Sequence, residues 1–161
     1  PPGYSNQQSY LAYCDGIVAD NLALFTLRYT DNITFIKSKC DKIKETYRLY
    51  CYGGMGQRIY QKNNGDLDAS LMECNNFENN FSKACISGLA IAAGYNYHQN
   101  LNLSIKECDK FEKEYKEKCY FTLGNYMGTY YQKNRSLALE ECKKINSKDK
   151  YDCIKGVLEI T

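Results

Sequence analysis

Eight of the nine cysteines in this 161-residue chain fall into two regular series. The members of each series are 34 residues apart, and every first-series cysteine begins a C-x10-C pair. The first series is Cys40, Cys74, Cys108 and Cys142, and the second is Cys51, Cys85, Cys119 and Cys153. Thiols can form disulfides, bind metals or act as nucleophiles, so residue context has to decide between these chemistries.

The context favours disulfides. A zinc site is not indicated, because the chain has no C-x2-C pair and only one histidine. The alternative is that reduced cysteines pack as small apolar residues, but packing alone would accept Ala or Val in some repeats. We therefore predict one disulfide within each C-x10-C pair, formed in an oxidising compartment. The predicted bonds are Cys40–Cys51, Cys74–Cys85, Cys108–Cys119 and Cys142–Cys153.

Cys14 belongs to neither series. It resembles the second cysteine of an earlier unit, whose partner would be expected near Gly3. An odd cysteine in an oxidising compartment indicates an intermolecular disulfide or a reactive thiol, and the alternative is a buried, inert thiol.

Residues suited to catalysis are few. The only histidine, His98, occupies the position of Asn64 and Gln132 in the neighbouring repeats, which favours an ordinary polar loop residue. No serine has a nucleophile motif around it, and there is no phosphate-binding loop or cluster of metal ligands. We therefore expect no catalytic residue, metal or cofactor, and a protein that is not an enzyme; a hydrolase is a remote alternative.

A fixed 34-residue period is typical of stacked helical repeats, in which each unit contacts only its neighbours. Six residues before each first-series cysteine stands a residue suited to cap a helix. These caps are Thr34, Asp68, Asn102 and Ser136. They predict short first helices over residues 35–44, 69–78, 103–113 and 137–145, each including an apolar residue three positions after the cysteine.

A second helix is predicted to open at each second-series cysteine, because apolar residues recur 0, 1, 4, 5 and 8 positions after it. Glycine also recurs on or beside this stripe. The glycines are Gly54, Gly88, Gly94, Gly128 and Gly156. Since glycine inside a helix is destabilising by itself, its recurrence predicts that neighbouring helices approach closely. The fold class is all-α, a solenoid of helix-turn-helix repeats.

Residues 1–161 are predicted to form a single repeat domain. Residues 1–9 are a tail and residues 10–31 a leading half-repeat helix. Four disulfide-stapled hairpins follow, over residues 32–65, 66–99, 100–133 and 134–161.

One unit resembles the Sel-one-like branch of the tetratricopeptide-type repeats. It reads Cys119-Tyr-Phe-Thr-Leu-Gly-Asn-Tyr126-Met-Gly128, followed by Asn134-Arg-Ser-Leu-Ala138-Leu. The cysteine layout is also similar to that of secreted bacterial cysteine-rich repeat proteins. The resemblance implies a right-handed α-solenoid that binds proteins or peptides. Some members are credited with penicillin binding or lactam hydrolysis, but no residues here match such a site, and the other units replace Tyr126 with Arg58 and Ala92.

Charge and hydropathy limit the partners. The net charge of +2 gives no reason to expect nucleic acid, and no apolar run is long enough to span a membrane. The start Pro-Pro-Gly, without Met, predicts a mature or excised segment. Together with the cysteines, four N-x-S/T sequons favour a secreted, cell-surface or periplasmic protein, with N-glycans where the host adds them. The sequon residues are Asn32, Asn80, Asn102 and Asn134.

Several second-helix residues lie off the core stripe and could contact a partner. They are Arg58, Ile91, Tyr95, Phe121, Asn125 and Tyr126. We expect a non-enzymatic scaffold that binds a protein or peptide on this face, although the same residues could pack on the next repeat. The alternative function is a structural subunit that stacks end to end into a filament or surface coat, since apolar Ile154, Val157 and Leu158 have no helix after them. Those ends could equally be where a longer protein was cut.

Overall fold

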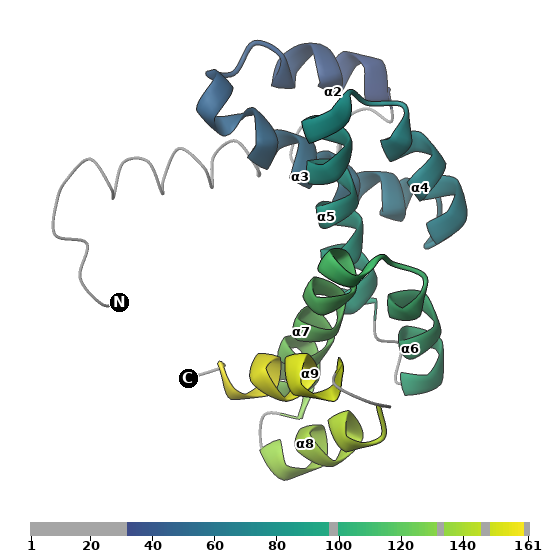
Figure 1. The fold of residues 1–161 in the computed structure, drawn as a ribbon, viewed down its shortest axis with the longest axis vertical. Helices are drawn as coiled ribbons and strands as arrows, with labels where there is room; N and C mark the ends of the chain where they lie inside the picture. The colour runs from purple at the N-terminus through teal and green to yellow at the C-terminus, as the bar shows by residue number, and fades with distance from the viewer. Residues whose placement is uncertain (1–31, 97–99, 132–133, 146–148, 160–161) are drawn as a thin grey trace, which may run out of the picture.

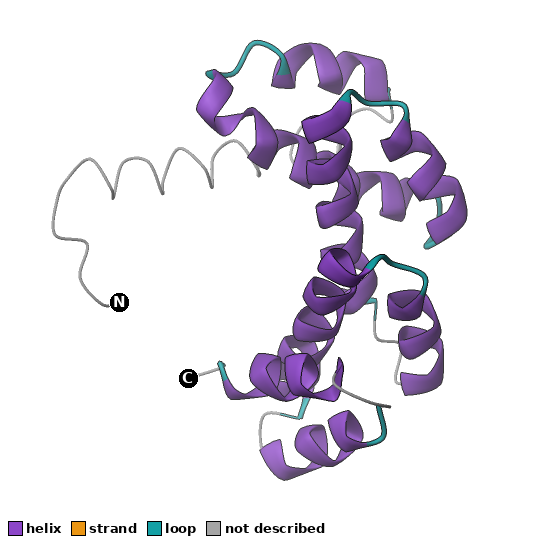
Figure 2. Ribbon diagram, viewed as in Figure 1, coloured by secondary structure: helices purple, strands orange, loops and turns teal. Residues whose placement is uncertain are grey.

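The computed structural model describes residues 32–96, 100–131, 134–145 and 149–159. The predicted leading helix and Cys14 lie outside these ranges, as does His98. The described residues form eight helices and no strand (Figure 2). The short helices are α2 (Ile33–Cys40), α4 (Leu67–Asn75), α6 (Leu101–Asp109) and α8 (Arg135–Lys143). They alternate with α3 (Glu45–Lys62), α5 (Asn79–Tyr95), α7 (Lys113–Tyr130) and α9 (Asp149–Leu158).

Each short helix is bonded to the helix that follows it by one disulfide, and the four pairs are those predicted. The Cα atoms of each pair lie 5.5 or 5.6 Å apart, which is ordinary disulfide geometry. All eight sulfurs belong to fully buried residues. The all-helical fold with four stapled helix pairs at regular spacing is therefore confirmed.

The predicted helix starts were wrong by two residues. The residues at the N-caps are Asn32, Asp66, Asn100 and Asn134. In the first three, the side-chain oxygen accepts the backbone N–H three residues later, at 3.0, 3.0 and 3.3 Å. The helices begin earlier because the residue after the cap is needed in the core: Leu67 and Leu101 are both buried there. Thr34, Asp68, Asn102 and Ser136 instead lie exposed within the first turn.

The turn between the two helices of a hairpin was also predicted wrongly. The apolar residues three positions after each first cysteine do not extend the short helix; they lie in the turn. Phe111 and Ile145 are buried there and fill the closed end of their hairpins. Helices α3, α5 and α7 begin six residues before their cysteines, so Cys51, Cys85 and Cys119 lie in the second turn of a helix rather than at its start.

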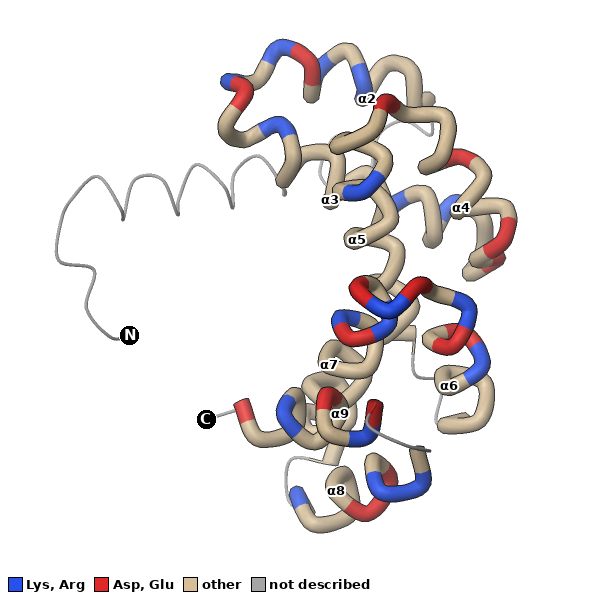
Figure 3. The backbone as a smooth tube through the Cα atoms, viewed as in Figure 1, with Lys and Arg blue, Asp and Glu red and all other residues tan. Residues whose placement is uncertain are grey.

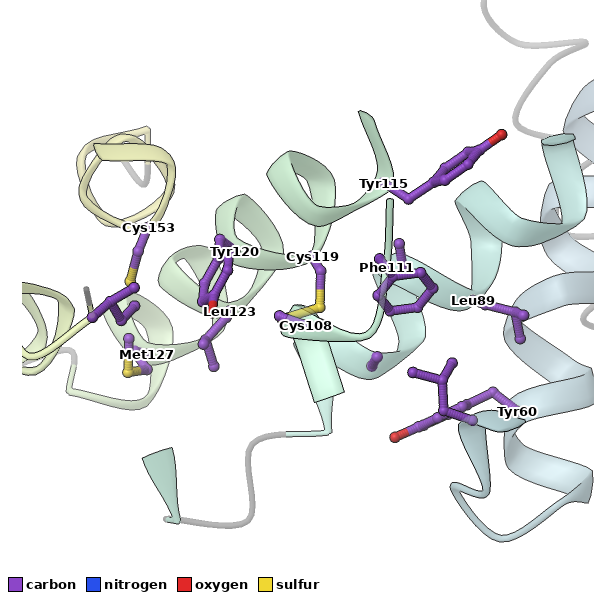
Figure 4. Packing of buried hydrophobic residues seen from close by; sticks show 14 of the residues in the cluster. Tyr60, Leu89, Cys108, Phe111, Tyr115, Cys119, Tyr120, Leu123, Met127 and Cys153 are labelled. Atoms are coloured by element: carbon purple, nitrogen blue, oxygen red, sulfur yellow. A yellow bond between two sulfur atoms is a disulfide. The ribbon is translucent and has the colours of Figure 1, made fainter. Parts of the chain in front are cut away.

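The helices α3, α5, α7 and α9 pack directly on one another in sequence order, and the short helices α4, α6 and α8 lie beside this row (Figure 1). Two core clusters follow the row: a smaller one joins α2 to the first half of α3, and a larger one runs from the end of α3 to α9. Figure 4 shows Cys119, Tyr120, Leu123 and Met127 on successive turns of α7, all buried, with the Cys108–Cys119 bond between them and the short helix. The row of long helices therefore presents one extended face.

Glycine sets the spacing of two of the three contacts in this row. A Cβ atom on Gly56 of α3 would lie 1.9 Å from the carbonyl oxygen of Cys85, and one on Gly88 of α5 would lie 1.9 Å from the oxygen of Gly53. The α7–α9 contact repeats this reciprocal pair with Gly124 and Gly156, at 1.9 and 2.0 Å. The predicted close approach is confirmed at Gly88 and Gly156, whereas Gly56 and Gly124 were not among the glycines on which the prediction rested.

The middle contact, between α5 and α7, is built differently. The positions that carry Gly56 and Gly88 in the first contact carry Ala90 and Thr122 here. A single glycine, Gly94, supplies the close approach: its Cβ would lie 2.6 Å from the oxygen of Cys119. The two contacts with reciprocal glycine pairs thus flank a middle contact that has a single close glycine.

One polar contact joins the first and third hairpins. The Tyr60 hydroxyl donates to Glu107 Oε2 at 2.7 Å and accepts from Asn96 Nδ2 at 2.9 Å. Burial, and then the hydrogen bond to Glu107, raise the pKa of Tyr60 above its usual value near 10. The hydroxyl therefore stays protonated and holds its place between the two hairpins.

Candidate functional site: a groove along the long helices

Two adjoining hollows lie along the face of the long helices. The first, of about 520 Å³, is lined by residues of α3, α5 and the start of α7; the second, of about 610 Å³, is lined by α5, α7 and α9. They share Ser87, Ile91, Glu114 and Lys118. We call the two together the long-helix groove, which crosses all four hairpins.

The second hollow has an apolar, aromatic lining. Ile91 and Phe121 are half-buried, and the Tyr95 side chain is 49% exposed. Tyr126 packs edge-on against Tyr95, with ring centroids 6.1 Å apart, and so fixes the orientation of that ring. Lys155 Nζ lies 5.9 Å from the centre of the Phe121 ring. Ordered aromatic rings of this kind can anchor a partner with little loss of side-chain entropy.

Charges of both signs border the groove. Lys83, Glu114 and Lys118 line the first hollow, and the second adds Glu117, Asp152 and Lys155. Lys118 Nζ donates to Ser87 Oγ at 2.8 Å, which holds the ammonium group over the centre of the groove. Figure 3 shows blue and red segments interspersed along the described helices, in keeping with the net charge of +2.

The carboxyl of Asp152, in the second hollow, has a raised pKa. Burial raises the pKa of this carboxyl, and the neighbouring charges of Glu117 and Asp149 raise it further, against the opposing effect of Lys155. A cationic group entering the second hollow would relieve this repulsion. The electrostatics therefore favour a partner that brings a positive charge to this end.

The structure brings together three of the six residues predicted to bind a partner. Ile91, Tyr95 and Phe121 line the second hollow, and the Tyr126 ring contacts the Tyr95 ring. Arg58 and Asn125 line neither hollow. Arg58 instead donates to Gln61 Oε1 at 3.2 Å, and the backbone of Asn125 lies in the close α7–α9 contact, where its nitrogen is 2.8 Å from a Cβ built on Gly156.

The prediction missed the first hollow, where Leu49 and Tyr50 are exposed. Both residues precede Cys51, in a stretch expected to be a turn. They are in fact in the second turn of α3. Extending the helical pattern of α3 back from Cys51 would have found them. Leu49 lies at the same helical spacing as the off-stripe residues that follow the cysteine.

The sequon asparagines all lie on the surface. Asn32, Asn80, Asn102 and Asn134 are exposed, and none lines the second hollow. Asn80 does line the first hollow, so a glycan there would compete with a ligand at that end.

Other chemistry is sparse in the described part of the chain. It contains no group of three or more His, Cys, Asp or Glu side chains that could hold a metal ion. Nor does any described helix combine the length and the apolar character needed to cross a membrane. No family model, curated protein or solved structure matches the chain. Function is therefore inferred from the groove itself.

Proposed function

We propose that this protein is a non-enzymatic interaction scaffold that binds a protein or peptide in the long-helix groove. The observation that supports this proposal is the second hollow, a site of about 610 Å³. Two consecutive hairpins contribute to it, through Ile91, Tyr95 and Phe121. On this view the chain is a right-handed α-solenoid, as its resemblance to Sel-one-like and tetratricopeptide-type repeats implies.

The shape and charge of the groove favour a peptide segment as ligand. The two hollows adjoin along four helices, so an extended or helical segment could occupy both at once. Its apolar side chains would contact Ile91 and Phe121. A basic residue would approach Asp152 and an acidic one Lys118, so that both signs of charge are matched.

The four buried disulfides support a place in an oxidising compartment. Within that class we propose a secreted, cell-surface or periplasmic protein. N-glycans at the exposed sequons would be consistent with it wherever the host glycosylates proteins.

Peptides selected from a random display library against the intact protein should bind through Phe121. We expect Phe121→Ala to weaken binding of such peptides at least about tenfold, because truncating a central aromatic anchor typically costs about 2 kcal/mol or more. Isothermal titration calorimetry measures the effect. Met72→Ala is the matched control, since Met72 is a large apolar side chain on α4 that is 72% exposed and lines neither hollow. Equal losses in the two variants would place the binding site elsewhere.

A second candidate function is end-to-end assembly into a filament or coat. The supporting observation is α9, which leaves Tyr151 and Leu158 exposed at the end of the row. Leu158 stands at the repeat position of Gly56 and Gly124, the residues that receive the next helix in the two tight contacts. A second copy meeting this end would form a heterologous contact that propagates.

For such a filament, sedimentation velocity should show a coefficient that rises with protein concentration. Leu158→Lys should abolish the rise, because a charge would be buried in the contact. The measurement is made in a Cys14→Ser background, so that intermolecular disulfides do not contribute. A coefficient that stays constant up to high concentration rejects assembly and leaves the peptide scaffold unaffected.

A further inference from the structure

A third pocket adjoins the groove at Tyr95, which lines both. It has a volume of about 450 Å³ and sits between the end of α3, the turn after it and the end of α5. Its polar groups are four amide side chains and two tyrosines: Gln57, Gln61, Asn64, Asn96, Tyr60 and Tyr95. We call it the amide pocket. Its volume falls in the range of about 300–1,000 Å³ that is typical of small-molecule sites.

None of the described residues that line the amide pocket has a charged side chain. Each hollow of the long-helix groove, by contrast, includes both lysine and acidic residues. In a chain of which 25% is charged, this separation is a chemical difference between two neighbouring sites. An ionic ligand would lose hydration in the amide pocket without gaining an ion pair, so the pocket favours a neutral one.

Interactions within the protein hold the base of the pocket in place before any ligand binds. Tyr60 is 3% exposed, and its hydroxyl is held between Glu107 and Asn96. The backbone N–H of Gly65 donates to the carbonyl oxygen of Tyr60 at 2.9 Å, which closes the turn over the end of α3. Gly65 has φ +82°, and a Cβ there would lie 3.2 Å from Asn96 Nδ2, so glycine both permits the turn and leaves room for the amide.

The Tyr95 ring is held at one side of the same pocket. It is half exposed, and its edge-to-face contact with Tyr126 on α7 sets its angle. Aromatic rings present a broad apolar face, whereas each primary amide offers two donors and one acceptor. The pocket thus combines one apolar ring face with amide groups that can both donate and accept hydrogen bonds.

We infer that the amide pocket binds a neutral saccharide. A pyranose ring has an apolar C–H face that can lie against Tyr95, and hydroxyls that each donate and accept a hydrogen bond, as the amides of Gln57, Gln61 and Asn64 require. Since the described lining offers no charged partner, recognition through phosphate, sulfate or carboxylate groups is not expected. This site goes beyond the proposed peptide scaffold; it shares Gln57 with the first hollow of the groove and Tyr95 with the second.

The test uses the intact, oxidised protein and a panel of neutral trisaccharides: maltotriose, cellotriose, mannotriose and triacetylchitotriose. Saturation-transfer NMR detects binding, and calorimetry measures it. We expect at least one trisaccharide to bind with Kd below about 10 mM, the weak end of the useful affinity scale. Binding should not change with salt concentration, because no ion pair forms.

Three variants locate the site. Gln61→Ala, which alters a residue of the amide pocket alone, and Tyr95→Ala should each weaken sugar binding at least about tenfold, which is about 1.4 kcal/mol. Tyr130→Ala is the matched control, since Tyr130 of α7 is 48% exposed, like Tyr95, but does not line this pocket. All three side chains are exposed, so the fold should survive, and circular dichroism checks it.

The proposal is overturned if no trisaccharide of the panel binds, if binding is equal in Gln61→Ala and the wild type, or if only charged sugars such as trigalacturonic acid bind. If Gln61→Ala no longer binds the display-selected peptides and no sugar binds the wild type, the amide pocket belongs to the peptide site instead. Peptide binding lost only in Phe121→Ala would support the scaffold whatever the sugar result.

Discussion

Replacing Gly56 with Ala should lower the free energy of unfolding by about 3 kcal/mol, at the upper end of what overpacking usually costs. The new Cβ would lie 1.9 Å from the carbonyl oxygen of Cys85 and 3.0 Å from the nitrogen of Leu89. Both are backbone atoms, which cannot turn aside as a side chain does. Helix α5 would have to move bodily away from α3, and Cys85 is tied to α4 by its disulfide. Urea unfolding followed by circular dichroism measures the change.

Gly53→Ala on the same helix is the matched control. A Cβ there would meet nothing closer than the oxygen of Ala84 at 3.7 Å, an ordinary contact. Because alanine is the better helix former, this variant should be neutral or more stable by up to about 1 kcal/mol. Equal destabilisation by Gly56→Ala and Gly53→Ala would contradict the close α3–α5 approach.

Removing one central disulfide is the second large change. The Cys74→Ala, Cys85→Ala double variant should lose about 3 kcal/mol of stability, the value expected when a cross-link of about this length no longer restricts the unfolded chain. The second hairpin packs against both the first and the third. In a solenoid, where each unit depends on its neighbours, its weakening should also reduce the cooperativity of unfolding. Chemical denaturation under oxidising conditions measures both effects.

Reduction supplies the control for this variant. After reductant has opened all the disulfides, the double variant and the wild-type protein should differ much less than they do when oxidised. Equal stability in the oxidised state would mean that the Cys74–Cys85 bond contributes nothing. A difference that persists unchanged in reductant would attribute the loss to packing of the sulfur atoms, both of which belong to buried residues.

The period of the cysteines was enough to predict the helical repeat and the four disulfides, because one C-x10-C pair recurs in every 34-residue unit. Helix starts were not predictable to the residue. Asp66 and Asp68 are equally good caps by type, and the choice between them depends on burial of Leu67, a tertiary effect. The turn was missed for a similar reason, since Phe111 is apolar at a helical spacing but fills the end of its hairpin.

The residues of the candidate groove could be predicted only in part from the sequence. Ile91 and Phe121 stood out as apolar residues off the core stripe, and the structure places both in the second hollow. Arg58 has the same repeat register as Tyr126 but a different environment, because repeats with equal spacing need not have equal neighbours. The amide pocket depends on the left-handed turn at Asn64 and Gly65, whose position relative to α5 no local pattern reveals.

The alternation of contacts along the row of long helices has a mechanical consequence. In the α3–α5 and α7–α9 contacts, backbone meets backbone at the glycine pairs, and a stack joined in this way is stiff. At α5–α7, Ala90 and Thr122 stand where those glycines would be, and only Gly94, near the end of α5, brings backbone close to backbone. A bending load on the molecule would therefore concentrate its strain at the middle joint, as in a rod with one softer segment. That joint crosses the second hollow, so the width of the groove and the curvature of the whole stack change together.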